Sequence, residues 1–202
     1  MLDKTFNNLI LRTGSAIIML SLFILSLFIV ESMFYPLMLG ILFGMLAEWH
    51  HITKNNCTIW FLGIFLTLPI IALCSIKHLS PCANALIFWY FIVIWSNDTF
   101  AMIFGKWLQG PKLAPYISPN KTWSGFCGGV ITAAIIGFSL YTFIAVKYNV
   151  ELFGKGWTGS AIFLMTLTIA AIAQMSDLSI SIVKRKFKVK DSGTFIPGHG
   201  GF

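Results

Sequence analysis

Six long apolar segments constrain the fold of this chain more than any other feature of its sequence. A helix needs about 20 mostly apolar residues to cross the hydrocarbon core of a bilayer, and most of these segments approach or exceed that length. Only 10% of the residues are charged, whereas a soluble domain carries about 25%. The sequence therefore predicts an all-α, polytopic helical membrane protein with about six transmembrane helices. The segments cover about residues 15–31, 34–49, 58–76, 84–105, 125–146 and 158–182.

The lengths of these segments predict how some of them sit in the bilayer. The second, at 34–49, is short, which predicts a tilted, shallow or re-entrant helix. The last, at 158–182, is longer than the hydrocarbon core requires, so its end is expected to project into water. We expect a single membrane domain over residues 1–202, with N-terminal spans at about 15–90 and catalytic-type spans and cytoplasmic loops at about 91–202.

Lysine and arginine residues are distributed unevenly between the two ends of the predicted spans. If the N-terminus is cytoplasmic, 11 of the 14 cations lie inside, as the positive-inside rule requires. We therefore expect a multi-pass protein of the inner (cytoplasmic) membrane with its N-terminus in the cytoplasm. The net charge of +7 is explained by this orientation and by anionic lipid, so no nucleic-acid partner is expected. The inside cations are Lys4, Arg12, Lys54, Lys106, Lys112, Lys121, Lys184, Arg185, Lys186, Lys188 and Lys190, and the outside ones are Lys77, Lys147 and Lys155.

Two carboxylates fall within predicted spans, where a charge is costly and usually functional. Asp98 precedes Lys106 by eight residues, and Asp177 precedes Lys184 by seven. At about 1.5 Å per residue, each carboxylate lies roughly 10 Å from the basic end of its helix, and both lie on the same side of the membrane. They are candidates for one cytoplasmic-side site. The alternative is that each is a buried hydrogen-bond acceptor that fixes helix packing.

A polar stripe runs along the last predicted span. Gln174, Asp177, Ser181 and Lys184 follow steps of three, four and three residues, which place them on one helix face. Such a stripe needs protein or water beside it instead of lipid. The alternative is that Lys184 extends to the interface and that Ser181 bonds to its own backbone.

Two polar connections on the cytoplasmic side contain residue types that bind phosphate. Residues 184–191 place five cations within seven positions, and 197–201 read Pro-Gly-His-Gly-Gly. Glycines allow backbone N–H groups to approach an anion closely. The other connection, 118–125, reads Ser-Pro-Asn-Lys-Thr-Trp-Ser-Gly and offers hydroxyls and a lysine. The alternatives are a topology signal, a flexible terminus and a simple re-entry turn.

Together these segments resemble the phosphatidate cytidylyltransferase family, also called the CDP-diacylglycerol synthases. Residues 181–201 are similar to the family signature S-x-x-K-R, four residues, K-D and then P-x-H-G-G. Residues 118–125 resemble its S-P-K-K-T-W-E-G segment, and Asn97-Asp98-Thr99 with Gly105-Lys106 resembles its aspartate-bearing span. The resemblance covers about residues 95–202, and the earlier part of the chain agrees only as apolar spans.

The chain departs from the family pattern at several positions. Asn120 stands where Lys is usual, Ser124 where Glu is usual, and Ser176 where Gly is usual. The family signature continues past H-G-G into D-R-x-D and a further span, whereas this sequence ends at Phe202. By resemblance, the first aspartate of D-R-x-D is a metal ligand. We therefore expect residues 1–202 alone to have little or no activity.

The resemblance implies transfer of CMP from CTP to phosphatidate, which yields CDP-diacylglycerol and pyrophosphate in phospholipid biosynthesis. CTP, phosphatidate and membrane lipid are the expected partners, with Mg²⁺ as cofactor, and a homodimer is left open. The catalytic residues that it implies are Asp177 as metal ligand, with Asp191, Lys184 and Arg185. The substrate-binding residues that it implies are Ser118, Lys121, Thr122, Ser181, Lys190, His199, Gly200 and Gly201, with Asp98 lining the cavity.

Three other functions agree with parts of this sequence. A transporter or channel also carries intramembrane acids, but here the polar features gather on one side only. A related membrane enzyme with a different lipid acceptor, such as a polyprenol kinase, would use similar phosphate chemistry. The third alternative is a truncated, non-catalytic family remnant that binds lipid or nucleotide.

Overall fold

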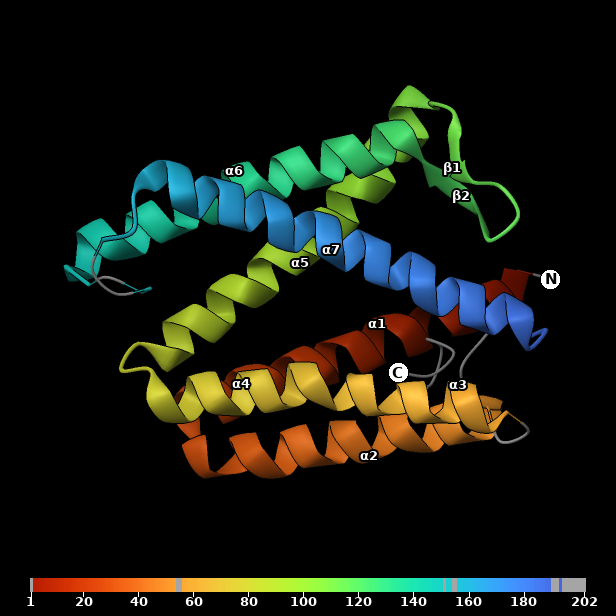
Figure 1. Cartoon of the computed structure of the whole chain (residues 1–202), viewed down its shortest axis with the longest axis horizontal. Coiled ribbons are helices and arrows are strands. Elements are labelled where there is room, and N and C mark those ends of the chain that lie inside the picture. The colour runs from red at the N-terminus through yellow and green to blue at the C-terminus, as the bar shows by residue number, and fades with distance from the viewer. Residues whose placement is uncertain (1, 54–55, 151, 154–155, 190–192, 194–202) are drawn as a thin grey trace. The chain divides into compact units, whose positions relative to one another are not determined.

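The computed structural model describes residues 2–53, 56–150, 152–153, 156–189 and 193, and these residues are almost entirely helical (Figure 1). Six helices within the described chain are long and apolar enough to cross a membrane. The prediction of an all-α protein with six spans is therefore confirmed. The spans are Leu11–Ile29, Glu31–Thr53, Cys57–Leu79, Ala83–Leu108, Trp123–Tyr148 and Gly159–Lys186.

The second and the last span test the lengths that the sequence predicted for them. The second span, Glu31–Thr53, has 23 residues, so the predicted short helix at 34–49 is wrong. The polar residues at its end suggest, from the sequence, that the helix has reached the membrane–water interface. In the structure the helix continues past them, because Glu48 and Trp49 are buried. The last span, Gly159–Lys186, has 28 residues and a length of about 42 Å, which exceeds the hydrocarbon core as predicted.

The chain divides into two compact units, and each is described by itself. The first unit comprises Met1–His78 and Lys184–Phe202. Within it, the Trp49 indole N–H donates to the Trp60 carbonyl oxygen at 3.1 Å, and this bond joins two successive helices. The elements are α1 (Leu2–Ile24) with a π-helical turn (Leu25–Ile29), a 3-10 turn (Glu31–Met33), α2 (Phe34–Thr53), α3 (Cys57–Leu62), a second 3-10 turn (Gly63–Leu66) and α4 (Thr67–Leu79).

The second unit, Leu79–Val183, contains an antiparallel helix pair joined by a β-hairpin. Figure 1 shows the hairpin at one end of α5 and α6. Lys112 pairs with Thr122, and Ala114 pairs with Ser118. The hairpin was not predicted, because strands of three and five residues carry too little alternation to distinguish them from a polar loop. The elements are α5 (Ala83–Leu108), β1 (Lys112–Ala114), β2 (Ser118–Thr122), α6 (Trp123–Tyr148) and most of α7 (Gly159–Lys186).

Small residues allow the helices of the second unit to pack closely. The Trp89 indole N–H on α5 donates to the Gly137 carbonyl oxygen on α6 at 2.7 Å. A Cβ atom at Gly137 would lie 2.7 Å from Val93 Cγ2, which is too close for a real contact. Ala133 and Ala170 are fully buried in the same core. Helices in membranes associate through such close packing, because lipid is as apolar as the side chains.

Candidate functional site

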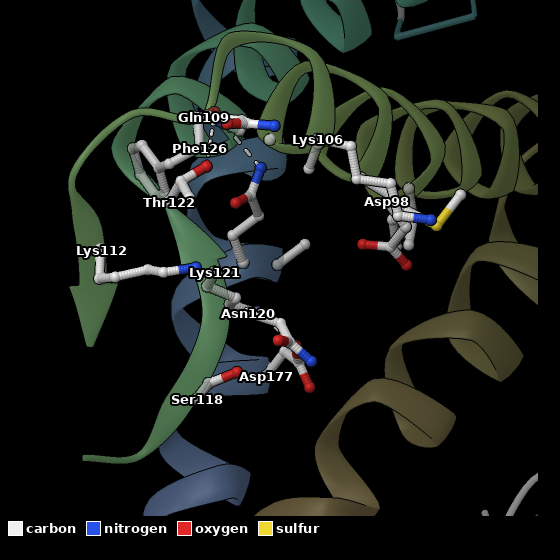
Figure 2. Close-up of a pocket in the computed structure, with 17 residues that line it drawn as sticks. Asp98, Lys106, Gln109, Lys112, Ser118, Asn120, Lys121, Thr122, Phe126 and Asp177 are labelled. Atoms are coloured by element: carbon white, nitrogen blue, oxygen red, sulfur yellow. Dashed lines mark hydrogen bonds and ion pairs between the residues drawn. The ribbon is translucent and has the colours of Figure 1, made fainter. Parts of the chain in front are cut away.

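A cavity of about 1060 Å³ lined by both polar and apolar side chains opens at the hairpin end of the second unit (Figure 2). All of its lining residues belong to that unit, so its geometry depends on one compact body. The walls come from α5, both strands, the first turn of α6, and α7. Its charged and hydroxyl-bearing side chains are Asp98, Lys106, Lys112, Ser118, Lys121, Thr122 and Asp177.

An ion pair between Lys121 and Asp177 connects β2 to α7 across this cavity. The Lys121 side chain is 25% exposed and the Asp177 side chain 63% exposed. The carboxylate is therefore accessible to a ligand although it lies on a membrane-spanning helix. This accessibility disfavours the alternative in which Asp177 is a buried packing acceptor. The structure thus brings together two residues that the sequence places 56 positions apart.

Asp98 faces the same cavity from α5 (Figure 2). Its carboxyl group lies within electrostatic range of both Asp177 and Lys121. Asp98 and Asp177 are both exposed, so water or a cation can reach both. The predicted placement of the two carboxylates in one site agrees with this geometry.

Thr122 marks the point where the hairpin becomes α6. Its hydroxyl oxygen accepts a hydrogen bond from the Gly125 N–H at 3.1 Å, as the N-cap of the helix, and the residue is only 5% exposed. The Ser124 hydroxyl lies 3.1 Å from the Thr122 hydroxyl and accepts from the Gly110 N–H at 3.2 Å. These bonds hold the hairpin against the helix and thereby fix the neighbouring Lys121. The phosphate contact expected of Thr122 stays a prediction.

The helices α5 and α6 pack closely against each other beside the cavity. A Cβ atom at Gly125 would lie 2.6 Å from the Ala101 carbonyl oxygen and 3.2 Å from Gly105 Cα. Only a residue without a side chain fits there. The glycine therefore sets the distance between the helix that carries Asp98 and the hairpin that carries Lys121.

A buried amide pair at the cavity, formed by the lining residue Gln174 and by Asn97, was not predicted as part of the site. Gln174 Nε2 donates to Asn97 Oδ1 at 2.8 Å, and Asn97 Nδ2 donates to the Ala170 carbonyl oxygen at 3.0 Å. Asn97 is fully buried and Gln174 is 4% exposed. This pair holds α5 against α7 next to both carboxylates. The signal in the sequence was that each amide stands in an apolar span close to one of the two aspartates.

Four further polar side chains line the cavity without having been assigned to it. Lys106 was part of a motif that resembles the family and Lys112 was counted as a topology charge, but neither lysine was assigned a binding role, and nor were Gln109 and Asn120. Gln109 ends α5 with φ 44°, in the left-handed region that non-glycine residues rarely adopt. The concentration of polar residues between positions 106 and 124 was the available signal.

The remaining predicted residues lie near or beyond the end of α7. The Ser181 hydroxyl donates to the Asp177 carbonyl oxygen at 2.8 Å, which is the backbone bond of the alternative interpretation. Lys184 and Arg185 lie in the last turn of α7. The predicted residues that fall outside the described part of the chain are Lys190, Asp191, His199, Gly200 and Gly201.

The oxygen donors of the cavity suit a hard cation such as Mg²⁺. They are the Asp98 and Asp177 carboxylates, the Asn120 amide oxygen and the Ser118 hydroxyl. Among the described residues, no cluster of three or more His, Cys, Asp or Glu side chains could hold a metal ion by itself. Mg²⁺ usually binds one or two carboxylates and completes its shell with water and substrate phosphates. The donor set therefore fits Mg²⁺ held jointly by protein and substrate.

Comparison with known proteins places the chain in a family. A model of the cytidylyltransferase family matches residues 55–202. The phosphatidate cytidylyltransferase of Rickettsia bellii is 41% identical over 199 residues, which cover 98% of this chain and 85% of that protein. The chain belongs to the cytidylyltransferase family. The resemblance predicted from the sequence motifs is confirmed.

Other relatives support the same family membership. The phosphatidate cytidylyltransferase of Rickettsia felis is 40% identical over 200 residues, which cover 99% of this chain and 87% of that protein. The Brucella abortus enzyme of the same name is 40% identical over 122 residues, which cover 60% of this chain and 42% of that protein. No solved structure matches the chain. The family match contains every residue that lines the cavity.

Proposed function

We propose that this protein is a membrane-bound phosphatidate cytidylyltransferase, which converts CTP and phosphatidate to CDP-diacylglycerol and pyrophosphate. The observation that carries the proposal is the cavity in which the Lys121–Asp177 pair meets Asp98. It lies at the end of membrane-spanning helices, in a chain about 40% identical to relatives named for this activity.

The reaction is an in-line displacement at phosphorus. A phosphate oxygen of phosphatidate attacks the α-phosphorus of CTP and forms a new P–O bond. The bond from the α-phosphorus to the oxygen that bridges to the β-phosphate breaks, and pyrophosphate leaves with that oxygen. The main task of the protein is to position two polyanions and to neutralise the charge that develops between them.

Three lysines of the cavity are suited to hold the phosphates of CTP. Lys106 comes from α5, Lys112 from β1 and Lys121 from β2. Cations on three separate elements can contact several phosphate groups at once, which a single basic run cannot do as rigidly. The family signature at 181–201 is the reason for proposing Lys184 and Arg185, in the last turn of α7, as further phosphate-binding residues.

Asp98 and Asp177 would hold Mg²⁺, with Asp177 as the principal ligand. When bound, Mg²⁺ neutralises charge on the phosphate oxygens. The Lys121 ammonium, held beside the Asp177 carboxylate, is placed to contact a phosphate brought to that carboxylate. Asn97 and Gln174 keep the two acid-bearing helices together and so maintain the spacing of the ligands.

We place the protein in the inner membrane with its N-terminus in the cytoplasm. The distribution of 11 of 14 cations supports this orientation. The cavity then opens toward the cytosol, where CTP is dissolved. The phosphate of a membrane lipid lies at the same interface, so both substrates can meet without either crossing the bilayer.

Incorporation of labelled CTP into lipid tests this function directly. The protein, expressed from its whole reading frame and purified, receives in mixed micelles CTP labelled in its cytidine part together with phosphatidate, diacylglycerol or a polyprenol. We expect label in the organic extract only with phosphatidate and Mg²⁺, and none after chelation of the metal. Cytidine label in a polyprenol instead would assign another acceptor for the CMP group. The absence of label with every acceptor, which is also the result for a polyprenol kinase that transfers only the γ-phosphate of CTP, would overturn the proposal.

A further inference from the structure

The ion pair between Lys121 and Asp177 puts an ammonium group against the carboxylate proposed as the principal metal ligand. The contact joins Lys121 Nζ to Asp177 Oδ2, and both residues belong to the second unit. Mg²⁺ binds carboxylate oxygen at about 2.0–2.1 Å. The ammonium and a metal ion therefore compete for the same oxygen, and one must leave before the other can bind there.

The second oxygen of Asp177 does not remove this conflict. A metal ion bound to it would still lie on the order of 5 Å from the ammonium. The repulsion between one and two positive charges at that distance weakens metal binding about tenfold or more, even in bulk water. Asp98 lies within electrostatic range of both Asp177 and Lys121, and it attracts a doubly charged ion more strongly than an ammonium. Exchange of the ammonium for a metal ion is therefore favoured by Asp98 and opposed by Lys121.

The backbone of Lys121 is held in place, so only its side chain can make this exchange. The next residue, Thr122, is the N-cap of α6, and its hydroxyl oxygen accepts from the Gly125 N–H. The Trp123 N–H donates to the Pro111 carbonyl oxygen at 2.9 Å, which ties the start of α6 to the hairpin. The flexible four-carbon stem of a lysine can still move its ammonium group without any movement of the hairpin.

The lining of the cavity decides where a displaced ammonium group can go. Asp98 and Asp177 are the acidic residues of that lining, and all of its residues lie in the described part of the chain. Lys106 and Lys112 line the same cavity, so a Lys121 side chain displaced by a metal ion would meet further positive charge. An anionic ligand removes this repulsion, and a polyphosphate offers several oxygens to the three lysines together.

We propose that Lys121 competes with the divalent metal ion for Asp177, and that the metal binds tightly only when a nucleotide phosphate takes up the Lys121 ammonium. This proposal rests on the proposed function, because it takes the phosphates of a nucleoside triphosphate as the groups that receive Lys121. Metal and nucleotide then strengthen each other's binding, and linkage makes this effect reciprocal. The metal ion is thereby bound together with the nucleotide on which it acts.

Binding of Mn²⁺ without nucleotide tests the competition independently of activity. Mn²⁺ prefers the same oxygen ligands as Mg²⁺, and electron paramagnetic resonance measures its free concentration in a detergent solution of the protein expressed from its whole reading frame. We expect Lys121→Met and Lys121→Gln each to bind one Mn²⁺ about tenfold more tightly than the parent. Lys121→Arg keeps the charge and should bind Mn²⁺ as the parent does. Damage to the fold would not produce a gain in affinity.

Lys112→Met is the matched control, because it removes another lysine that lines the same cavity. Among the described side chains, Lys112 forms no ion pair with either Asp98 or Asp177. Its replacement should change Mn²⁺ affinity by less than about threefold. The gain should also disappear when Asp177→Asn is added to Lys121→Met. The proposal is overturned if neither neutral variant of Lys121 gains affinity, if Lys112→Met gains as much, or if the gain survives Asp177→Asn.

A CTP analogue tests the coupling between metal and nucleotide. In this analogue a methylene group replaces the oxygen between the α- and β-phosphates, so pyrophosphate cannot leave. Its Kd is measured with a chelator and again in saturating Mg²⁺. We expect the factor by which Mg²⁺ strengthens binding to fall about tenfold from the parent to Lys121→Met. Binding of Mg²⁺ to the free analogue is common to both proteins and cancels. An equal factor in both proteins would refute the coupling.

Neither measurement needs a lipid acceptor, so the two proposals can fail separately. The expected Mn²⁺ and analogue results in a protein that makes no CDP-diacylglycerol would overturn the proposed function and support the competition at Asp177. Parental Mn²⁺ affinity in both neutral variants of Lys121, in a protein that does make CDP-diacylglycerol, would overturn the competition alone.

Discussion

Replacing Asp177 by asparagine separates its role in the reaction from its role in the fold. The change keeps the size of the side chain and removes its charge. The ion pair with Lys121 is partly exposed on both sides, at 25% and 63%. Pairs of this kind contribute about 0–1 kcal/mol. We therefore expect Asp177→Asn to change the free energy of unfolding by less than about 1 kcal/mol.

The expected effect on turnover is much larger. Loss of a group that merely supports a metal ligand costs about 10–100-fold in affinity or activity, so loss of the ligand itself should cost at least about 100-fold. The assay is the initial rate of CDP-diacylglycerol formation over a Mg²⁺ titration, with the protein expressed from its whole reading frame. Thermal unfolding in detergent, followed by tryptophan fluorescence, measures stability on the same preparations.

Glu31→Gln is a matched control for this experiment. Glu31 is 67% exposed and lies 3.7 Å from Lys77, so this variant also removes the charge of an exposed, ion-paired carboxylate. It lies outside the cavity and should retain parental turnover. Near-normal turnover of Asp177→Asn would remove the metal-binding role, and a large loss of stability in that variant would show that the activity loss reflects unfolding.

Three further predictions concern the cavity and its orientation. Lys112→Met should raise KM for CTP and weaken inhibition by pyrophosphate about tenfold. The control variant Lys147→Met should change neither quantity. A rise in KM for phosphatidate alone would assign Lys112 to the lipid phosphate. Gly125→Ala should destabilise the protein by about 1–3 kcal/mol by forcing α5 and α6 apart, and an unchanged melting temperature would contradict that packing. Single cysteines in place of Lys112 and Lys188 should react with an impermeant thiol reagent from the cytoplasmic side, and one in place of Lys147 from the other; labelling of the first two from opposite sides would refute the topology.

The six spans follow from the sequence because the bilayer imposes a simple requirement. Each crossing needs a continuous apolar helix of sufficient length. Apolar runs such as 125–146 can therefore be recognised as membrane spans from the sequence. Acids inside such runs are conspicuous for the same reason, and both Asp98 and Asp177 were recognised as site candidates. The family membership was also accessible, because the motifs at 118–125 and 181–201 are locally specific.

Local sequence did not reveal the β-hairpin or the cavity role of its first strand. Strand β1 has three residues and β2 five, so neither shows a period from which a strand can be predicted. Lys112 was therefore interpreted as an ordinary charged residue of a polar connection. Only the pairing of Lys112 with Thr122 shows that it belongs to a wall of the cavity.

The sequence by itself determined how many helices cross the membrane and which helix faces are polar, because these properties depend on neighbouring residues and on helical periodicity. Tertiary structure alone decided which residues meet: Lys121 with Asp177, Asn97 with Gln174, and Glu48 with Gly193. Helices in lipid gain little from burying apolar surface against each other, so their partners are chosen by close steric fit and a few polar contacts. Such fit depends on residues far apart in the chain.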